Sequence, residues 1–327
     1  MLSPGRGLRR AGFGELAMHG GDGAWAVAAT VEGGAAPVDL GTGVSPDTKD
    51  RPRRVRINGT DARLVEQLGE HLRVLWITPS MDGLFSGPAA DRRRFFDRLV
   101  SALIPGHGSE LNAYERAMRQ RNRLLTETAD PEWMLAIETE MAAHAAAIHF
   151  ARTDTLNHLS RLLKTATDTA FPTAVIELVG LADFEGAGGV STALEGAYLG
   201  IWKKARSVDR AAGRTTIGPH RIDIAVSHVL KRMPANLCST GEQKALLVNL
   251  VLAHAQLVGR MSGMTPILLL DEIAAHLDSA RRRALYQRLN ALGTQCWMTG
   301  TDPHLFEPLG ADAQAFVVTQ GKLAPAG

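Results

Sequence analysis

The chain has 327 residues, and 45% of them are hydrophobic, which is enough for a large buried core in one or two domains. Its 36 Lys and Arg nearly balance its 34 Asp and Glu, so the overall charge gives no reason to expect a nucleic-acid partner. Two cysteines provide no disulfide framework or paired metal motif, and no run approaches about 18 apolar residues. We therefore expect a cytoplasmic protein without a membrane segment.

Residues 1–87 have the pattern of short strands and turns. Two segments have strand character, "AWAVAATVEG" (24–33) and "RRVRING" (53–59), and the second ends in an Asn-Gly pair typical of a tight turn. The polar stretch "GTGVSPDTKDRPRR" (41–54) predicts a loop. The apolar run "VLWIT" (74–78), which Pro79 ends, predicts a buried strand.

Helical patterns begin near residue 88 and dominate up to about residue 167. Two long patterns are separated by Asp130-Pro131, and a proline at the first helical position after an acidic cap is a start signal. We expect these two helices to form an antiparallel arm. The segment "EGAGGVSTALEGAYLG" (185–200) is glycine-rich but carries no lysine where a phosphate loop needs one, so it predicts a loop leading into a helix. The expected division is 1–87 and 206–327 for two parts of one domain and 88–205 for the arm.

The last 110 residues alternate between strands and helices. Helices are predicted at 240–259 and 279–292. Strands are predicted at "FPTAVIELVG" (171–180) just before this region and, within it, at "HRIDIAVSHV" (220–229), "PILLL" (266–270), "QCWMTG" (295–300) and "AFVVTQG" (315–321). Such alternation with continuous apolar strands predicts an α/β fold with a parallel sheet covered on both faces.

Two adjacent carboxylates, Asp271 and Glu272, directly follow the apolar strand at 266–270. Open α/β sheets bind ligands at the carboxyl ends of their strands. There, one carboxylate can hold Mg²⁺ through water and the next can polarise an attacking water molecule. The alternative is that the pair only begins the next helix.

A second candidate site is the start of the helix at residue 240. Ser239 suits a helix cap, and Gly241 allows the backbone to approach an anion at the positive end of the helix, with Glu242 following. An ordinary capped helix has the same pattern. However, a capped helix, a buried strand, Asp-Glu and His-Leu-Asp in this order resemble the signature, Walker B strand, catalytic glutamate and D-loop of an ATP-binding cassette.

The chain resembles the RecF family, bacterial recombination and repair ATPases related to SMC-type heads, over essentially its whole length. The segments that carry the resemblance occur in family order: "LSPGRGLRRA" (2–11), "TPSMDGLFSGPAADRRRFFDRL" (78–99), "NAYERAMRQRNRLL" (112–125), "GPHRIDI" (218–224), "CSTGEQKALLV" (238–248) and "LLLDEIAAHLD" (268–278). The resemblance implies an ABC-type ATPase head with a mixed or parallel sheet and an inserted α-helical arm.

The resemblance also implies roles for individual residues. Ser239, Gly241 and Glu242 match the signature, which contacts ATP held by the opposite subunit. Asp271 matches the aspartate that holds Mg²⁺ through water, and Glu272 matches the general base. Asp278 matches the D-loop aspartate, and residues 299–302 match the switch loop. His220, Arg221 and Asp223 belong to a family motif for which a structural salt bridge and nucleotide contact are equally open.

The phosphate loop Gly-x-x-x-x-Gly-Lys-Ser/Thr is absent from this sequence, since the one Gly-Lys pair, Gly321-Lys322, is followed by Leu323. In the family this loop lies upstream of the segment that matches residues 2–11. We therefore expect that the chain begins after it.

The implied function is an ATP- and Mg²⁺-dependent homodimer on single-stranded, double-stranded or gapped DNA, acting with RecR and RecO to load RecA. Candidate DNA contacts are Arg51, Arg53, Arg54 and Arg56, although solvated surface is the more common explanation for such groups. Two alternatives remain: a non-catalytic DNA- or RecR-binding protein, and another ABC-type ATPase, such as a transporter subunit, which the helical arm disfavours.

Overall fold

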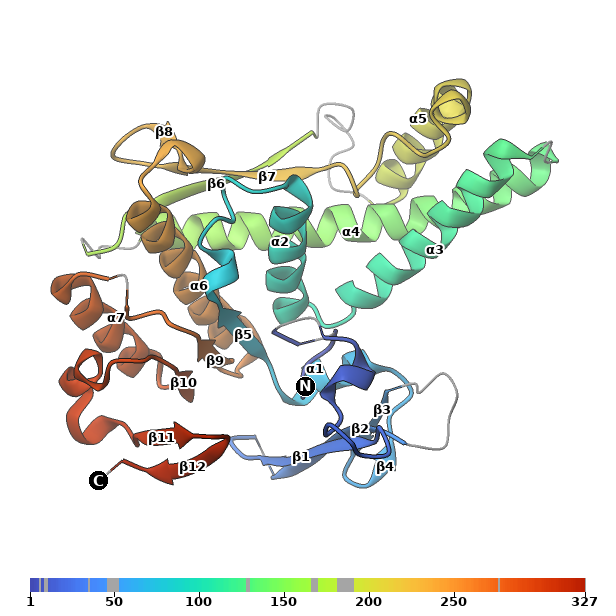
Figure 1. Cartoon of the computed structure of the whole chain (residues 1–327). Coiled ribbons are helices and arrows are strands. Elements are labelled where there is room, and N and C mark those ends of the chain that lie inside the picture. Colours follow the sequence, from blue (N-terminus) through green and yellow to red (C-terminus); the bar gives the residue numbers. More distant parts are fainter. Residues whose placement is uncertain are drawn as a thin grey trace.

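We analysed a computed structural model of the whole chain (Figure 1). It describes residues 1–5, 7–8, 11–34, 36–45, 53–127, 130–165, 170–180, 191–275 and 277–326. The first element is an antiparallel sheet with four strands: β1 (Trp25–Val31), β2 (Val38–Val44), β3 (Arg54–Ile57) and β4 (Thr60–Asp61). A short helix, α1 (Leu68–His71), packs against it through Leu68 and Leu72.

The predicted parallel sheet contains three strands in the order β10–β9–β5. These are β5 (Val74–Ile77), β9 (Ile267–Leu270) and β10 (Cys296–Met298). Leu75 and Leu268 point to the same face as Ile77 and Leu270, and all four side chains are almost completely buried. This face therefore carries the centre of the main core.

Two smaller sheets complete the strands. One is antiparallel and contains β6 (Ala174–Val179), β7 (Asp223–His228) and β8 (Met233–Pro234). The other is a hairpin of β11 (Phe316–Thr319) and β12 (Lys322–Pro325). Figure 1 shows this hairpin below the parallel sheet, beside the end of β1.

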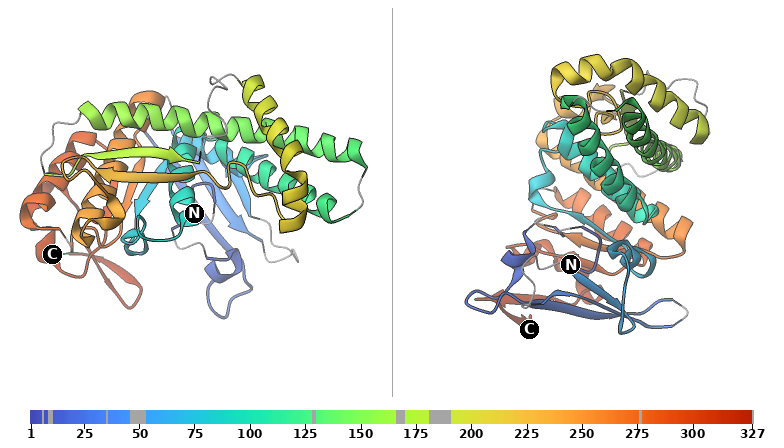
Figure 2. Two further views of the ribbon diagram at one scale, coloured as in Figure 1. Left: turned by 90° about the horizontal axis from the view of Figure 1, so that it is seen from above. Right: turned by 90° about the vertical axis from the view of Figure 1, so that its right-hand side faces the viewer.

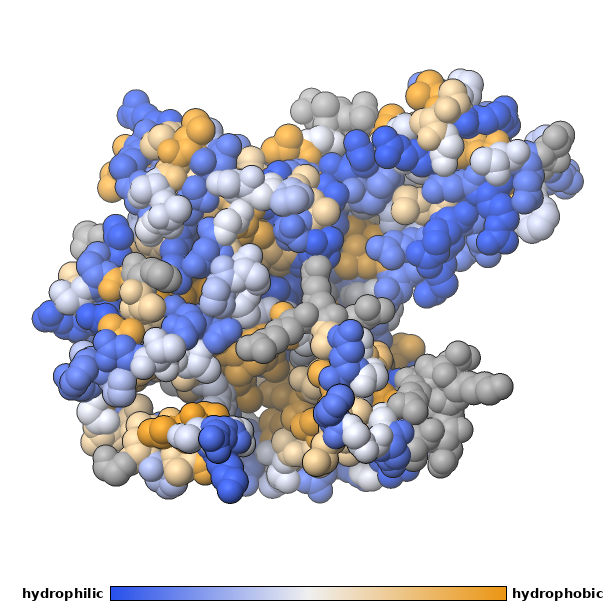
Figure 3. Space-filling view, viewed as in Figure 1, coloured by the Kyte–Doolittle hydropathy of each residue, from blue (hydrophilic) through white to orange (hydrophobic). Residues whose placement is uncertain are grey.

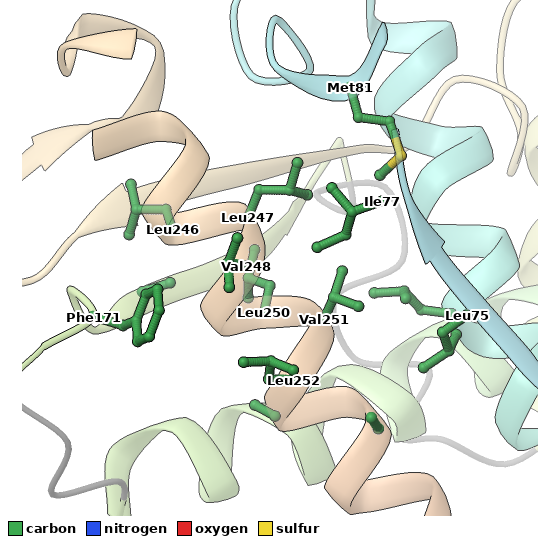
Figure 4. Packing of buried hydrophobic residues seen from close by; sticks show 14 of the residues in the cluster. Leu75, Ile77, Met81, Phe171, Leu246, Leu247, Val248, Leu250, Val251 and Leu252 are labelled. Carbon is green, nitrogen blue, oxygen red and sulfur yellow. The ribbon is translucent and has the colours of Figure 1, made fainter. Parts of the chain in front are cut away.

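Helix α6 (Thr240–Ser262) lies against the inner face of the parallel sheet and is buried along most of its length. Figure 4 shows Leu247 and Val251 of α6 facing Ile77 and Leu75 of β5. Within the described residues, α6 is the one helix long and apolar enough to cross a membrane, but 72% of that apolar stretch is buried inside the fold. It is the core helix of the domain, and the helix α7 (Ser279–Leu292) packs on its outer side.

The arm projects from this domain (Figures 1 and 2). It contains α3 (His107–Thr126), α5 (Ser191–Ala212) and the first part of α4 (Pro131–Thr165), whereas α2 (Ala89–Leu103) packs in the main core of the head. The distal part holds a fully buried ionic cluster in which Arg121 bonds Glu138 at 3.1 Å and Asp209 at 2.6 Å. Burial makes such charges depend on one another, since removing one partner leaves an uncompensated charge.

Charged and polar contacts join the arm to the head. Arg152 of α4 binds Asp97 of α2 through two nitrogens at 2.8 Å and donates to the Pro219 carbonyl at 2.7 Å. The Tyr114 hydroxyl lies 2.7 Å from Nδ1 of His220, whose Nε2 lies 3.1 Å from a backbone carbonyl. Burial lowers the pKa of His220 to about 4, so the ring is neutral at physiological pH, with Nε2–H as donor and Nδ1 as acceptor.

Most predicted elements are confirmed, including the tight turn at Asn58 and Gly59 and the helix start at Pro131. The loop prediction is wrong for residues 41–44, which extend strand β2, because Thr42 pairs with Val55 across the sheet. The strand at 315–321 exists as β11, but it pairs with β12 rather than with the parallel sheet. Residues 46–52 and 181–190 lie outside the described part of the chain. The domain limits stay a prediction; β6, inside the predicted arm, pairs with β7.

Gly218 is the residue of the head–arm junction that tolerates substitution least. Its φ is +150°, and a Cβ there would collide with the Tyr114 hydroxyl. We expect Gly218→Ala to lower the free energy of unfolding by about 3 kcal/mol, because backbone strain and overpacking add. Gly213→Ala is the matched control: its φ is +63° with open space around the added Cβ, so it should cost only about 1 kcal/mol. Urea unfolding at neutral pH measures both, and equal losses would contradict the collision.

Candidate nucleotide site at the end of the parallel sheet

The acid pair lies at the carboxyl end of β9, beside the end of β10. The Thr299 hydroxyl, just after β10, donates to Oδ1 of Asp271 at 2.5 Å and accepts from the Glu272 backbone N–H at 3.3 Å. The Asp271 N–H in turn donates to the Ile77 carbonyl of β5 at 2.9 Å. The helix-cap interpretation of this pair is wrong, because α7 begins only at Ser279 and Asp278 caps it. Three strands converge on Asp271 and Glu272, and both side chains remain partly accessible.

A cavity of about 650 Å³ opens next to Asp271. Its walls are Trp76 and the segment between β5 and α2, with Arg98 and Phe95 of α2. The Arg98 guanidinium stacks over the Trp76 ring at 4.2 Å, which places a fixed positive charge in the wall. Asp271 therefore borders a hollow whose wall also contains a guanidinium group.

The start of α6 is the second candidate site. Ser239 is the N-cap; its N–H and hydroxyl donate to Glu242 Oε2 at 3.1 and 2.9 Å. Lys231 binds the other carboxylate oxygen at 2.5 Å, and this bond, with those from Ser239, lowers the pKa of Glu242 to about 2. Ser239 is exposed, and a Cβ added at Gly241 would meet no atom within 4 Å, so a ligand can approach the helix end closely.

Asp278 is separate from both sites. Its carboxylate accepts from the Arg281 N–H at 2.8 Å as the N-cap of α7, and its side chain is exposed. Within one chain, the structure thus brings Asp271 together with Glu272 and Ser239 together with Glu242. It leaves Asp278 apart from both pairs, at the start of α7.

The residues of the Gly-Pro-His-Arg motif have structural partners. His220 contacts Tyr114, and Asp223 binds Arg92 at 2.6 Å across the start of the arm, whereas Arg221 is exposed. The sequence left a structural role and a nucleotide contact open for this motif. The contacts of His220 and Asp223 are those expected of the structural role.

The predicted basic group does not form one surface. Arg53 points inward and donates to the Thr42 hydroxyl and to the carbonyls of Ser3 and Gly5. Arg54 and Arg56 are exposed on β3, and Arg56 pairs with an aspartate of β4. Arg51 lies outside the described residues. Whether any of them contacts DNA stays a prediction.

Sequence reasoning missed Lys244, which is only 3% exposed in the first turn of α6. Its Nζ lies 3.4 Å from Asp82 Oδ2 and 3.4 Å from the backbone carbonyl of Glu272. A lysine inside an otherwise apolar helix was the available sign, because a buried ammonium requires partners.

The outer face of the parallel sheet is covered only in part, because Arg98 of α2 stacks on Trp76 but Trp297 is exposed. Trp76, Leu269 and Trp297 form one row across β5, β9 and β10; the first two are half-buried and Trp297 is 53% exposed. No described strand pairs with the other edge of β10. Figure 3 shows apolar side chains lining a hollow above the hairpin β11–β12, whose strand residues are all exposed. The predicted covering of both sheet faces is therefore not seen in the described part of the chain.

Solved structures resemble this architecture, although no protein-family profile matches the chain. A RecF–ATPrS structure, described as a recombination mediator of the RecFOR pathway, superimposes with a TM-score of 0.82 at 19% identity, covering 100% of this chain and 86% of the other. A RecF–ATP structure gives 0.70 at 19% identity, covering 89% and 77%. The chain therefore shares the α/β fold of these RecF structures, as the resemblance in the sequence implied.

Curated relatives identify the family. The chain is 52% identical over 327 residues to the DNA replication and repair protein RecF of Mesorhizobium japonicum, covering 99% of this chain and 86% of the relative. It is 51% identical over 325 residues to RecF of Rhizobium meliloti, covering 99% and 87%. The chain belongs to the RecF family of DNA replication and repair proteins.

Replacing Lys231 should raise the pKa of Glu242. Lys231→Met removes the largest cause of the low value, so the pKa should move from about 2 towards the ordinary 4.5. In the wild type, the stability from this carboxylate is complete above about pH 4.5 and is lost as the pH falls through about 2; the variant should lose most of this acid dependence. A carboxyl ¹³C NMR titration measures the pKa. Lys231→Arg should keep it low, and an unchanged value in Lys231→Met would contradict the assignment.

Proposed function

We propose that the chain is the head of an ATP-dependent DNA-binding protein of recombinational repair, with ATP and Mg²⁺ at the end of the parallel sheet. The observation that carries this proposal is the acid pair that Thr299 orients beside a cavity of about 650 Å³. Asp271 suits Mg²⁺ held through water, and Glu272 suits a general base.

We further propose that a second copy completes the site. Ser239, Gly241 and Glu242 lie at an accessible helix end, whose unpaired N–H groups and dipole favour an anion. Because this helix end is accessible from outside the chain, it can receive the γ-phosphate of ATP held by the opposite head. In such a dimer Asp278, which is exposed, lies across the interface.

Binding the ATP phosphates in this way requires a phosphate loop, and the motif Gly-x-x-x-x-Gly-Lys-Ser/Thr does not occur in the 327 residues. The open edge of β10 and the apolar row of Trp76, Leu269 and Trp297 suit a strand–loop–helix unit, because parallel sheets are buried on both faces. The Mesorhizobium relative has 14% of its length outside the match, which is 100% minus the 86% covered. We propose that a unit of this kind supplies the loop.

The partners follow from the family. The two RecF structures are of RecF with ATPrS and of RecF with ATP, and both are described as a recombination mediator in the RecFOR pathway. We infer that this chain binds single-stranded and gapped duplex DNA as an ATP-dependent dimer and promotes RecA loading with RecR and RecO. The arm, which projects from the head, offers the surface for DNA or RecR.

The sequence left a second candidate open, a non-catalytic DNA- or RecR-binding protein. ATP hydrolysis and DNA binding should be compared between this chain and an upstream-extended version that carries Gly-x-x-x-x-Gly-Lys-Ser/Thr. Turnover in the extended version alone supports the ATPase; DNA binding without turnover in both supports the second candidate.

In the extended version, Glu272→Gln should slow ATP hydrolysis by roughly 10²–10⁴-fold, the usual contribution of a general base. ATP-dependent dimers should still form, because the amide keeps the shape of the side chain. Steady-state turnover and sedimentation measure the two effects. Glu140→Gln, which removes an exposed arm carboxylate, is the control and should change neither. Normal turnover in Glu272→Gln would exclude Glu272 as the base.

Ser239→Arg should block ATP-dependent dimerisation and leave ATP binding to one head intact, because the bulky cation fills the accessible helix end. Ser207→Arg adds the same charge to an exposed position of α5 and should dimerise normally. Sedimentation with and without ATP distinguishes the variants. If Ser239→Arg dimerises like the wild type, the helix end does not meet the second nucleotide.

A further inference from the structure

The backbone of Glu272 is in an unusual conformation. Its φ is +54°, in the left-handed region that residues with a Cβ rarely occupy and that must be held by surrounding contacts. Strand β9 ends at Leu270, and the chain bends at Asp271 and Glu272 directly after it. The groups that contact the two peptide units of Glu272 can therefore hold this conformation.

Two side chains hold the two peptide units of Glu272. The Thr299 hydroxyl accepts from the Glu272 N–H at 3.3 Å, and the Lys244 ammonium donates to the Glu272 carbonyl at 3.4 Å. We call these two contacts, from Thr299 and Lys244 to the Glu272 backbone, the clamp. Thr299 follows β10, whereas Lys244 lies near the start of α6, so the clamp joins elements that are distant in sequence. Thr299 simultaneously donates to Asp271, which ties the clamp to the neighbouring acid.

Lys244 is itself held in place. Its Nζ also contacts Asp82 at 3.4 Å, in the segment that walls the cavity. The neighbouring Gln243 accepts from Ser86 of the same segment at 3.1 Å and donates to the Cys238 carbonyl at 2.9 Å. Gln243 and Lys244, near the start of α6, therefore connect the segment of the cavity wall with the backbone of Glu272.

We propose that Lys244 and Thr299 are positioning residues that hold Glu272 in its strained conformation, and that Lys244 makes this conformation depend on the position of the α6 N-terminus. Movement of that helix end relative to β9 withdraws the donor from the Glu272 carbonyl and releases the strain. Binding at Ser239 and Glu242 is thereby communicated to the base. The role of Glu272 as base rests on the proposed function; the clamp does not.

Amide hydrogen exchange, followed by NMR on the 327-residue chain without nucleotide, tests the clamp. The informative variant is Lys244→Met, because the Glu272 N–H contacts Thr299 and not Lys244. Faster exchange at this amide would therefore report a change of backbone conformation. We expect about a tenfold increase or more, as for a lost hydrogen bond to a charged group. The amide of Leu40, in the distant N-terminal sheet, should be unaffected.

Four further variants separate positioning from mere stabilisation. Lys244→Arg should restore slow exchange, and Asp82→Asn, which removes the ion pair that helps to hold Lys244 but leaves the carbonyl bond, should accelerate Glu272 exchange less than Lys244→Met does. Thr299→Val should accelerate it, and Thr299→Ser should not. Unchanged exchange at Glu272 in Lys244→Met, or equal acceleration at Leu40, would overturn the clamp.

In the upstream-extended version, Lys244→Met should lower kcat for ATP with little change in KM, and Lys244→Arg should rescue it. An unchanged kcat alongside faster exchange at Glu272 would overturn the positioning role. If the wild type neither binds nor hydrolyses ATP, the proposed function fails, and the exchange data alone then decide whether the clamp exists.

Discussion

The burial of helix α6 against the parallel sheet is the constraint on which the other elements depend. Leu247 and Val251 pack against β5, and the far side of the helix meets α2, α4 and α7. Each large apolar side chain that moves back into water costs about 1.5–3 kcal/mol, so the helix cannot slide without losing much of the core. Its first residues, Ser239 to Glu242, lie outside this buried stretch and next to Lys244, which contacts the Glu272 carbonyl.

The same constraint extends to the arm through α4. Ala151 and Leu159 of this helix lie in the core around α6, whereas Met141 and Ala145 lie in the core of the arm. One uninterrupted helix thus belongs to both hydrophobic cores, and the bond from Arg152 to Asp97 of α2 fixes its rotation at the junction. A movement of the arm should therefore reach the head as a rigid-body displacement of α4.

The sequence predicted the helices and strands well, because their apolar periodicity reflects which face is buried. It predicted the acid pair for the same reason, since Asp271 and Glu272 end an apolar strand. It could not predict partners that depend on tertiary contacts. Nothing in residues 315–321 distinguishes a strand of the parallel sheet from a hairpin strand, and the contact of Lys244 with the Glu272 carbonyl joins residues 28 positions apart.

The two halves of the candidate site differ in how they are organised. The acid half is organised by contacts inside the chain, because Thr299 binds the Asp271 carboxylate and, together with Lys244, the backbone of Glu272. The half at the α6 N-terminus is accessible, and its own carboxylate, Glu242, is held by Lys231 and Ser239. That bond turns the acidic oxygens towards a lysine and leaves the helix dipole to face an anion from outside. The contact of the buried Lys244 with the Glu272 carbonyl connects the two halves, so a displacement of the accessible helix end changes the support of the backbone at the acid pair.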